Sequence, residues 1–213
     1  MTPFTKVTAI AAPLLRDNID TDAIIPSREM RSASKKGLAD GLFAGWRYTA
    51  IGSREPQPDF VLNRARYAGA QILVGGANFG CGSSREHAVW AMAEYGFRAV
   101  VAPSFNPIFK GNCIANGMVP VMLDHAAVDT IATALEQAAE PLLTVDLEMQ
   151  RVALTQGLSW PFAIDGEARE ALLAGRDPIG QTLQLAERIR RFREQDVTVR
   201  PWIYRTVATS PAE

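Results

Sequence analysis

The sequence predicts an α/β fold, with a partly parallel sheet and β-rich edges. The first observation behind this prediction is that short apolar segments alternate with helical segments between residues 70 and 123. This order is typical of parallel strands joined by right-handed helical crossovers. The second observation is that apolar segments follow one another closely at 142–154 and 158–164, which is typical of antiparallel strands. No second core is indicated, so we expect one domain of two or three layers over residues 1–200 and a tail over 201–213.

The first part of the chain predicts a strand, a turn and a second strand. Residues 7–15 and 22–26 are apolar and β-branched, and the polar residues 16–21 between them are typical of a turn. Residues 27–59 are polar and contain several glycines. A connection of this length inside a compact domain is usually functional or mobile.

The middle and the end of the chain contain the remaining elements. We expect strands at 70–76, 97–103 and 118–123, and helices at 84–96, 104–117, 125–140, 166–175 and 178–195. In the helix expected at 84–96, Ala88, Met92 and Tyr95 recur with the spacing of one apolar face. Gly96 is the residue type that commonly follows the end of a helix.

The composition narrows the possible functions. The chain has 213 residues, 47% of them hydrophobic, and its 22 Lys and Arg nearly balance its 23 Asp and Glu. A net charge of -1 does not favour binding to nucleic acid or to an anionic membrane. No apolar run reaches the roughly 18 residues of a membrane span, and Pro13 interrupts the only apolar stretch near the start, so we expect neither an anchor nor a signal peptide.

The cysteines and histidines indicate a reduced protein without a metal site of its own. Cys81 and Cys113 are the two cysteines, and His87 and His125 the two histidines. Two thiols that are distant in sequence suggest a cytoplasmic location, and with two scattered histidines they make a poor zinc site. They are also too few to supply the three or four thiolates of an iron–sulfur cluster.

The glycine-rich stretch NFGCGSSREHA, residues 78–88, predicts an anion site. Ser83 and Glu86 fit the capping-box pattern, with Ser83 before the first turn of a helix. Helix amides without partners and the helix dipole favour an anion at this position, and Gly80 and Gly82 would let the backbone approach a ligand. Arg85 could bind a carboxylate through two donors. The alternative is that Ser83 only caps a helix, because capping serines are common.

Common nucleotide and hydrolase motifs do not fit this stretch. A Walker loop requires a lysine that is absent here, and Arg85 stands where a GxGxxG motif has its third glycine. The stretch also lacks the closing glycine of a GxSxG nucleophile elbow. A cradle for carboxylate or phosphate groups remains.

Two separated motifs then resemble a known family. NFGCGSSREHA, with NIDTDAIIP upstream and YGF, VVAPSF, IF and GN downstream, is similar to the small subunits of 3-isopropylmalate dehydratases in the aconitase superfamily. The resemblance extends from about residue 7 to about residue 195. It implies a swivelling β/α domain that closes over a [4Fe-4S] cluster held by a separate large subunit, in a heterodimer or a larger assembly, with no cluster bound by this chain alone.

The resemblance also implies an activity and residues for it. Members of this family isomerise 2-isopropylmalate and 3-isopropylmalate by dehydration and rehydration, in leucine biosynthesis, so the chain is expected to be a hydro-lyase subunit that is active only with its partner. Ser83 corresponds to the family's catalytic base, and Ser84 and Arg85 to contacts with a substrate carboxylate. The open iron of the cluster would act as a Lewis acid on the substrate hydroxyl.

Several positions stay open. In the loop after IIP, Arg28 and Arg31 are candidates to bind a substrate carboxylate, although a solvated basic loop is an equal alternative. Asp20 and Asp22 match a family motif but are also ordinary turn residues. Cys81 is expected to pack beside the cradle, and His87 has no assigned role.

Two alternative functions also remain at this point. One is a related hydro-lyase acting on citraconate, dimethylmaleate or homoaconitate, because the 28–36 loop differs most within the family. The other is a non-enzymatic module that binds a dicarboxylate or phosphate at the glycine turn. The preferred alkyl-substituted malate and the stoichiometry of the complex do not follow from the sequence.

Overall fold

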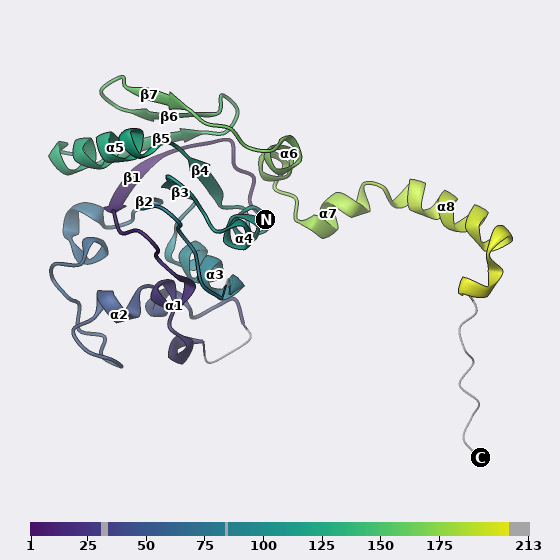
Figure 1. Cartoon of the computed structure of the whole chain (residues 1–213), viewed down its shortest axis with the longest axis horizontal. Coiled ribbons are helices and arrows are strands. Elements are labelled where there is room, and N and C mark those ends of the chain that lie inside the picture. Colours follow the sequence, from purple (N-terminus) through teal and green to yellow (C-terminus); the bar gives the residue numbers. More distant parts are fainter. Residues whose placement is uncertain (31–33, 84, 205–213) are drawn as a thin grey trace, which may run out of the picture. The chain divides into compact units, whose positions relative to one another are not determined.

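The structure is a computed structural model that describes residues 1–30, 34–83 and 85–204. The chain forms two compact units, Met1–Asp177 and Pro178–Glu213, which are described separately (Figure 1). The prediction of a single domain over 1–200 with a tail over 201–213 stays a prediction.

The first unit is built on a seven-stranded sheet with the order β4-β3-β2-β1-β5-β6-β7. The strands are β1 (Lys6–Leu14), β2 (Ile72–Gly75), β3 (Ala99–Ala102), β4 (Val119–Met122), β5 (Leu142–Asp146), β6 (Arg151–Leu154) and β7 (Ser159–Pro161). The pairs β1–β2, β2–β3 and β3–β4 are parallel, whereas β1–β5, β5–β6 and β6–β7 are antiparallel. This arrangement confirms the predicted α/β class, the partly parallel sheet and the β-rich edge.

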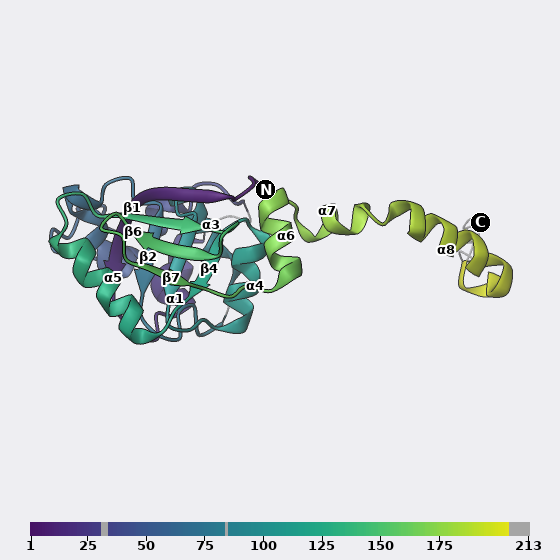
Figure 2. The ribbon, with the colours of Figure 1, turned by 90° about the horizontal axis from the view of Figure 1, so that it is seen from above.

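Helices cover both faces of the sheet (Figures 1 and 2). The α-helices of this unit are α1 (Thr21–Ile24), α2 (Ala44–Arg47), α3 (Glu86–Tyr95), α4 (Pro107–Ala115), α5 (His125–Gln137) and α6 (Gly166–Ala174). Ile72 and Val74 of β2 pack into one apolar cluster with α5 and α6, while Leu73 packs into another with α1–α4. Successive side chains of a strand point to opposite faces, so a continuously apolar strand supplies both cores.

Several helices begin or end at residues whose types are typical of helix caps. Asn106 accepts hydrogen bonds from the amides of Ile108 and Phe109 at the start of α4, and Asp124 accepts one from Ala127 at the start of α5. At the end of α3, Gly96 adopts a left-handed backbone with φ 119° and so ends the helix as expected.

Two expected elements are different in the structure. The prediction of a strand over residues 22–26 is wrong, because α1 occupies Thr21–Ile24. Asp20 initiates this helical turn by accepting a hydrogen bond from the Ala23 amide at 2.6 Å. The helix expected over 178–195 is also interrupted, since it divides into α7 (Pro178–Leu183) and α8 (Ala186–Val199).

The polar connection over 27–59 is largely irregular in its described part. Besides α2, it contains the short 3₁₀ helices Ser27–Glu29 and Ala39–Gly41, and two more follow it at Val61–Asn63 and Ala65–Tyr67. Leu38, Leu42 and Phe43 are nevertheless buried in the cluster with α1–α4. The connection is therefore packed onto the sheet-covering helices and is not a free loop.

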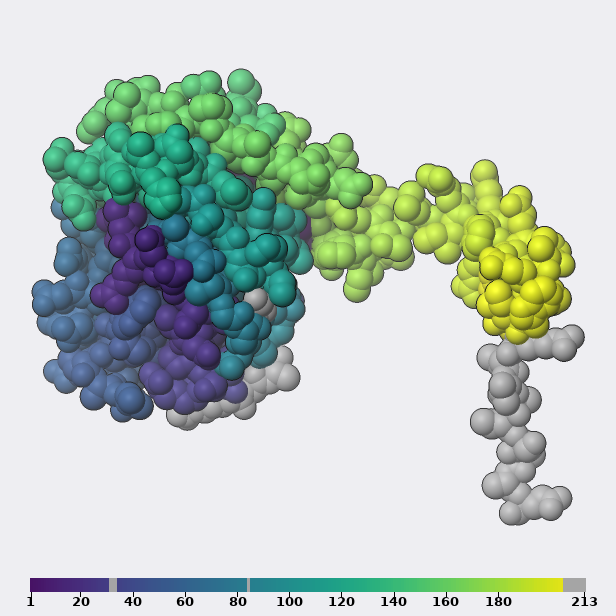
Figure 3. Space-filling view, in the orientation of Figure 1, coloured from purple at the N-terminus to yellow at the C-terminus, as the bar shows by residue number. Residues whose placement is uncertain are grey.

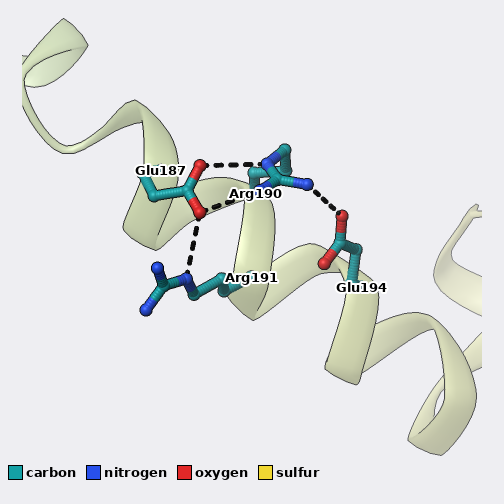
Figure 4. A network of polar contacts seen from close by, with 4 residues as sticks. All are labelled: Glu187, Arg190, Arg191 and Glu194. Atoms are coloured by element: carbon teal, nitrogen blue, oxygen red, sulfur yellow. Dashed lines mark hydrogen bonds and ion pairs between the residues drawn. The ribbon is translucent and has the colours of Figure 1, made fainter.

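The second unit consists of α7, α8 and the 3₁₀ helix Pro201–Tyr204 in its described part. None of the residues 178–204 is buried. One side of α8 carries an ion-pair network between Glu187, Arg190, Arg191 and Glu194 (Figure 4). Among all helices within the described ranges, none has both the length and the apolar composition of a membrane span.

Candidate functional site

The glycine turn lies at the carboxyl edge of the parallel strands, between the continuations of β1 and β3. On one side, the Gly80 amide donates to the Ile19 carbonyl at 2.7 Å and the Thr21 amide donates to the Cys81 carbonyl at 3.0 Å. On the other side, the Phe79 amide donates to the Ser104 carbonyl at 3.0 Å. Figure 3 shows the purple segment after β1 at the surface of the unit. The two sequence motifs, distant along the chain, are therefore joined at the edge where α/β folds bind ligands.

The glycines of the turn permit close packing within the protein. Gly80 has φ 74°, and a Cβ atom there would lie 2.1 Å from Cγ of Phe109. Gly82 has φ 84°, and its Cβ would lie 3.2 Å from Cβ of Asp20. The sequence predicts that these glycines admit a ligand, but at Gly80 the missing side chain leaves room for the Phe109 ring.

The expected capping box between Ser83 and Glu86 is wrong. Helix α3 begins at Glu86, and its N-cap residue, Arg85, makes no capping hydrogen bond through its side chain. The Glu86 carboxylate instead accepts hydrogen bonds from Asn116 Nδ2 at 2.9 Å and from Trp90 Nε1 at 3.3 Å. Because α3 begins at Glu86, Ser83 lies two residues before the N-cap position, and the N-cap residue Arg85 supplies no side-chain cap.

Ser83 is exposed and has one side-chain partner in the described part of the chain. Its Oγ lies 3.3 Å from Oγ1 of Thr21. Thr21 is the single polar residue that is buried among the described residues, with 0% exposure. A buried hydroxyl beside an exposed one can fix the orientation of the latter. The sequence pattern does not single out Thr21, although it stands between the two aspartates of NIDTDAIIP.

Arg85 is held by an ion pair with Asp22. The distance from Arg85 Nη1 to Asp22 Oδ1 is 2.8 Å, and the side chains are 35% and 56% exposed. The capping-box pattern places Arg85 within the first turn of the helix, but in the structure Arg85 is the N-cap residue and precedes the helix. The second aspartate of the upstream motif therefore orients the arginine of the downstream motif, while Asp20 caps α1.

Other residues of the two motifs have structural contacts. The His87 ring packs on the Trp90 ring with a centroid distance of 4.7 Å. Burial raises the pKa of the Cys81 thiol, and the negative charge of Asp20 raises it further. A thiol with a raised pKa is a poor nucleophile, which agrees with the expected packing role of Cys81.

The predicted loop residues are only partly described. Arg28 belongs to the 3₁₀ helix Ser27–Glu29, and its Nε lies 3.5 Å from Oε1 of Glu29. Glu29 also accepts a hydrogen bond from Arg54 Nη2 at 2.6 Å, which raises the pKa of Arg54. Arg31 and Ser84 lie outside the described residues.

Glu94 lies on α3, the helix that follows the glycine turn, and it binds the polar connection over residues 27–59. Its carboxylate accepts hydrogen bonds from the backbone amides of Gly37 at 2.7 Å, Ala39 at 2.9 Å, and Leu38 between them. Burial disfavours the ionised form, but the three amides outweigh it and lower the pKa of Glu94 below its usual value of 4.5.

This contact predicts a pH-dependent contribution to stability. Since the folded pKa is the lower one, the contribution of Glu94 is present above pH 4.5 and is lost as the pH falls through the folded pKa. Glu94→Gln is expected to lower the free energy of unfolding at pH 7 and to change it little once the carboxylate is protonated. Urea unfolding of both proteins between pH 7 and pH 3 measures the difference. A constant difference over this range would contradict the role of the charge.

The described residues do not fit a metal centre of this chain's own. No group of three or more His, Cys, Asp or Glu side chains within these ranges is arranged to hold a metal ion. Cys113 is fully buried, and burial raises the pKa of its thiol. The chain therefore lacks the ligands of an iron–sulfur cluster in its described part.

The fold and the two joined motifs define an aconitase-type C-terminal domain. The family pattern described as the aconitase C-terminal domain matches residues 1–126 of the chain. A solved structure of 3-isopropylmalate dehydratase (LeuD) from Methanocaldococcus jannaschii is similar, with a TM-score of 0.63 and 26% sequence identity over 88% of this chain and 99% of that one.

More specific relatives are similar over nearly the whole chain. A 3-isopropylmalate dehydratase small subunit from Cupriavidus necator is 54% identical over 205 residues, covering 96% of this chain and 99% of the relative. One from Rhodospirillum centenum is 46% identical over 202 residues, covering 95% and 98%. The chain belongs to the family of 3-isopropylmalate dehydratase small subunits, within the aconitase superfamily.

Proposed function

We propose that this chain is the small subunit of a cytoplasmic 3-isopropylmalate dehydratase, which interconverts 2-isopropylmalate and 3-isopropylmalate in leucine biosynthesis. The observation that supports the proposal best is that side chains of the NIDTDAIIP motif contact side chains of the NFGCGSSREHA motif. Thr21 lies against Ser83 at 3.3 Å, and Asp22 lies against Arg85 at 2.8 Å. This pairing presents a hydroxyl and a guanidinium together at an exposed edge.

In this proposal, the substrate carboxylate binds at Arg85 and at the amino end of α3. The guanidinium offers a planar pair of donors, and the positive end of the helix dipole favours negative charge. Asp22 uses Nη1 of Arg85, so a carboxylate would bind through the other nitrogens of the same side chain. Ser84 is proposed as a second contact from the same motif, and Arg28 and Arg31 as contacts from the loop after α1.

Ser83 is proposed as the base. In the dehydration direction, its oxygen takes the proton from the carbon next to a carboxylate, the C–O bond to the hydroxyl on the adjacent carbon breaks, and a double bond forms. A serine must be an alkoxide to act in this way. A hydrogen bond donated by Thr21, the positive charge of Arg85 and the helix dipole each stabilise such an alkoxide. Because Ser83 is not the N-cap residue of α3, its oxygen is not required as a helix cap.

The large subunit is proposed to complete the site. Ser83 is exposed in this chain, and no group of three or more His, Cys, Asp or Glu side chains among the described residues is arranged to hold a metal ion. We therefore propose that a second polypeptide encloses the site from water. We propose that the large subunit carries the [4Fe-4S] cluster, in a heterodimer or a larger assembly. The cluster would supply a Lewis acid for the departing hydroxyl.

Reconstitution tests the proposed function. The purified chain alone is expected to be inactive, and addition of the large subunit loaded with its cluster is expected to start hydration of 2-isopropylmaleate. Citraconate, dimethylmaleate and homoaconitate serve as competing substrates in the same assay. Turnover by the isolated chain, or a higher kcat/KM for a competitor, would contradict the proposal. A module that only binds anions would show binding without turnover in either arrangement.

Thr21 is expected to position Ser83. Thr21→Val removes the hydroxyl at nearly constant volume, and we expect kcat to fall by about tenfold, which corresponds to the loss of one net hydrogen bond. Thr21→Ser restores the hydroxyl and is expected to recover most of the kcat. The readout is kcat of the reconstituted enzyme together with KM, which is expected to change little. Equal losses in both variants would indicate a packing role instead.

A further inference from the structure

The first residue of α3 places a negative charge beside the proposed substrate site. Glu86 directly follows Arg85, the residue proposed to bind a substrate carboxylate. A free Glu86 carboxylate would repel a dicarboxylate, and it could compete with the substrate for the Arg85 nitrogens that Asp22 does not use. In the structure, the Glu86 carboxylate is bound by Asn116 instead. The partner that holds Glu86 therefore affects how an anion can bind at Arg85.

Asn116, at the carboxyl end of α4, has a partner for every polar position of its amide. Its Nδ2 donates to Glu86 Oε1 at 2.9 Å and to the Asn112 carbonyl at 2.9 Å. Its Oδ1 accepts from Trp90 Nε1 at 3.1 Å and from Lys35 Nζ at 3.4 Å. The indole and the ammonium can only donate, whereas the carboxylate and the carbonyl can only accept, so the amide has one possible orientation. Asn116 thus presents its donor to Glu86.

The same network brings a positive charge near Glu86. Lys35 Nζ lies 4.8 Å from the centroid of the Trp90 ring, in addition to its hydrogen bond to Asn116. Trp90 Nε1 also donates to Glu86 Oε1 at 3.3 Å. Lys35 is therefore joined to Glu86 through two neutral side chains, and its charge offsets that of the carboxylate.

We propose that Asn116 is a positioning residue for substrate binding, which keeps the Glu86 carboxylate from pairing with Arg85 and so leaves the amino end of α3 positive. This inference rests on the proposed function, because that function supplies the substrate carboxylate at Arg85. Asn116 touches no substrate and acts through Glu86. We expect the effect in KM and not in kcat, because the proposed base, Ser83, has its side-chain contact with Thr21 outside this network.

The principal test is Asn116→Asp in the reconstituted enzyme. This substitution keeps the shape of the side chain but replaces the donor that faces Glu86 with an acceptor, so the two carboxylates repel each other and Glu86 is released. We expect KM for 2-isopropylmaleate to rise at least about tenfold and kcat to change less than about threefold. Steady-state kinetics at saturating large subunit measure both constants.

A reciprocal exchange tests whether the pairing of donor and acceptor is responsible. Asn116→Asp combined with Glu86→Gln returns one amide and one carboxylate to the pair, with their places exchanged. Trp90 and Lys35 can still donate to the carboxylate at position 116. We expect the double variant to recover KM to within about threefold of the wild-type value, as coupled neighbouring residues do.

Asn63→Asp is the matched control for Asn116→Asp. Asn63 is also half-buried, and its Nδ2 donates to the carbonyls of Arg47 at 2.6 Å and Gln57 at 2.8 Å. The control therefore also loses two donated hydrogen bonds and gains a charge, but its partners belong to neither motif. We expect it to lower the midpoint of thermal unfolding, followed by circular dichroism, and to change KM less than about twofold.

Lys35→Met is a second variant at an exposed position, which tests the network if Asn116→Asp does not fold. It removes the charge that offsets Glu86, and we expect KM to rise about threefold with kcat unchanged. In the Glu86→Gln background, the same substitution is expected to leave KM unchanged, because the charge to be offset is absent.

Several results would overturn the inference. If Asn116→Asp or Lys35→Met leaves KM at the wild-type value, or lowers kcat alone, Asn116 does not position the site and the proposed function is unaffected. An equal rise of KM in Asn63→Asp, or no recovery in the reciprocal variant, would attribute the change to lost packing. If the wild-type assembly does not act on 2-isopropylmaleate, the proposed function fails, and this inference fails with it.

Discussion

Ser83→Ala is expected to lower kcat of the reconstituted enzyme by about 100- to 10,000-fold, the usual contribution of a positioned base. The change removes the atom that we propose takes the proton and leaves Arg85 and the amino end of α3 in place. KM for 2-isopropylmaleate is therefore expected to change by less than about threefold. Steady-state kinetics at saturating large subunit measure both constants.

Ser159→Ala is the control for this substitution. Ser159 is a serine on β7, at the far edge of the sheet from β2, where it accepts a hydrogen bond from Arg151. Its replacement is expected to leave kcat unchanged. If Ser83→Ala retained more than about a tenth of the wild-type kcat, Ser83 would not be the base and the assignment would fail.

Gly80→Ala is expected to have the largest effect on stability. Its Cβ would overlap the Phe109 ring at 2.1 Å, and φ 74° is a backbone conformation that disfavours alanine. Overpacking and the left-handed backbone together are expected to cost about 2–5 kcal/mol of unfolding free energy. Since the turn carries Ser83, the activity of any folded fraction is also expected to fall. Urea unfolding followed by circular dichroism provides the measurement.

Gly111→Ala is the matched control for Gly80→Ala. Gly111 belongs to the same helix as Phe109, a Cβ atom added there would meet no heavy atom within 4 Å, and its φ is not positive. Its replacement is expected to stabilise the protein by up to about 1 kcal/mol. Equal stabilities of the Gly80 and Gly111 variants would show that the contact with Phe109 does not determine the turn.

The sequence correctly predicts the helices and strands whose periodicity and capping residues lie within their own segments. The apolar segments of β2, β3 and β4 and the helices between them have the expected types, and Gly96 ends α3 as predicted. The antiparallel strands β5–β7 are also as expected. In these segments the periodicity, the caps and the burial all favour the same structure, so local reasoning is sufficient.

The sequence-based predictions are wrong where tertiary contacts determine the local structure. The apolar residues 22–26 have strand composition, but the cap from Asp20 and burial of Thr21 and Ile24 favour the turn of α1. Glu86 fits a capping box, yet Asn116, 30 residues later, binds its carboxylate. The contacts of Thr21 with Ser83 and of Asp22 with Arg85 span 62 and 63 residues, and no periodicity or spacing within one segment encodes them.

The most direct test of the proposed site is a structure of this chain assembled with the large subunit and 3-isopropylmalate. We predict that a substrate carboxylate contacts Arg85 and that Ser83 Oγ lies within about 3–3.5 Å of the carbon whose proton is removed. A substrate bound elsewhere, with Ser83 and Arg85 facing solvent, would contradict both assignments.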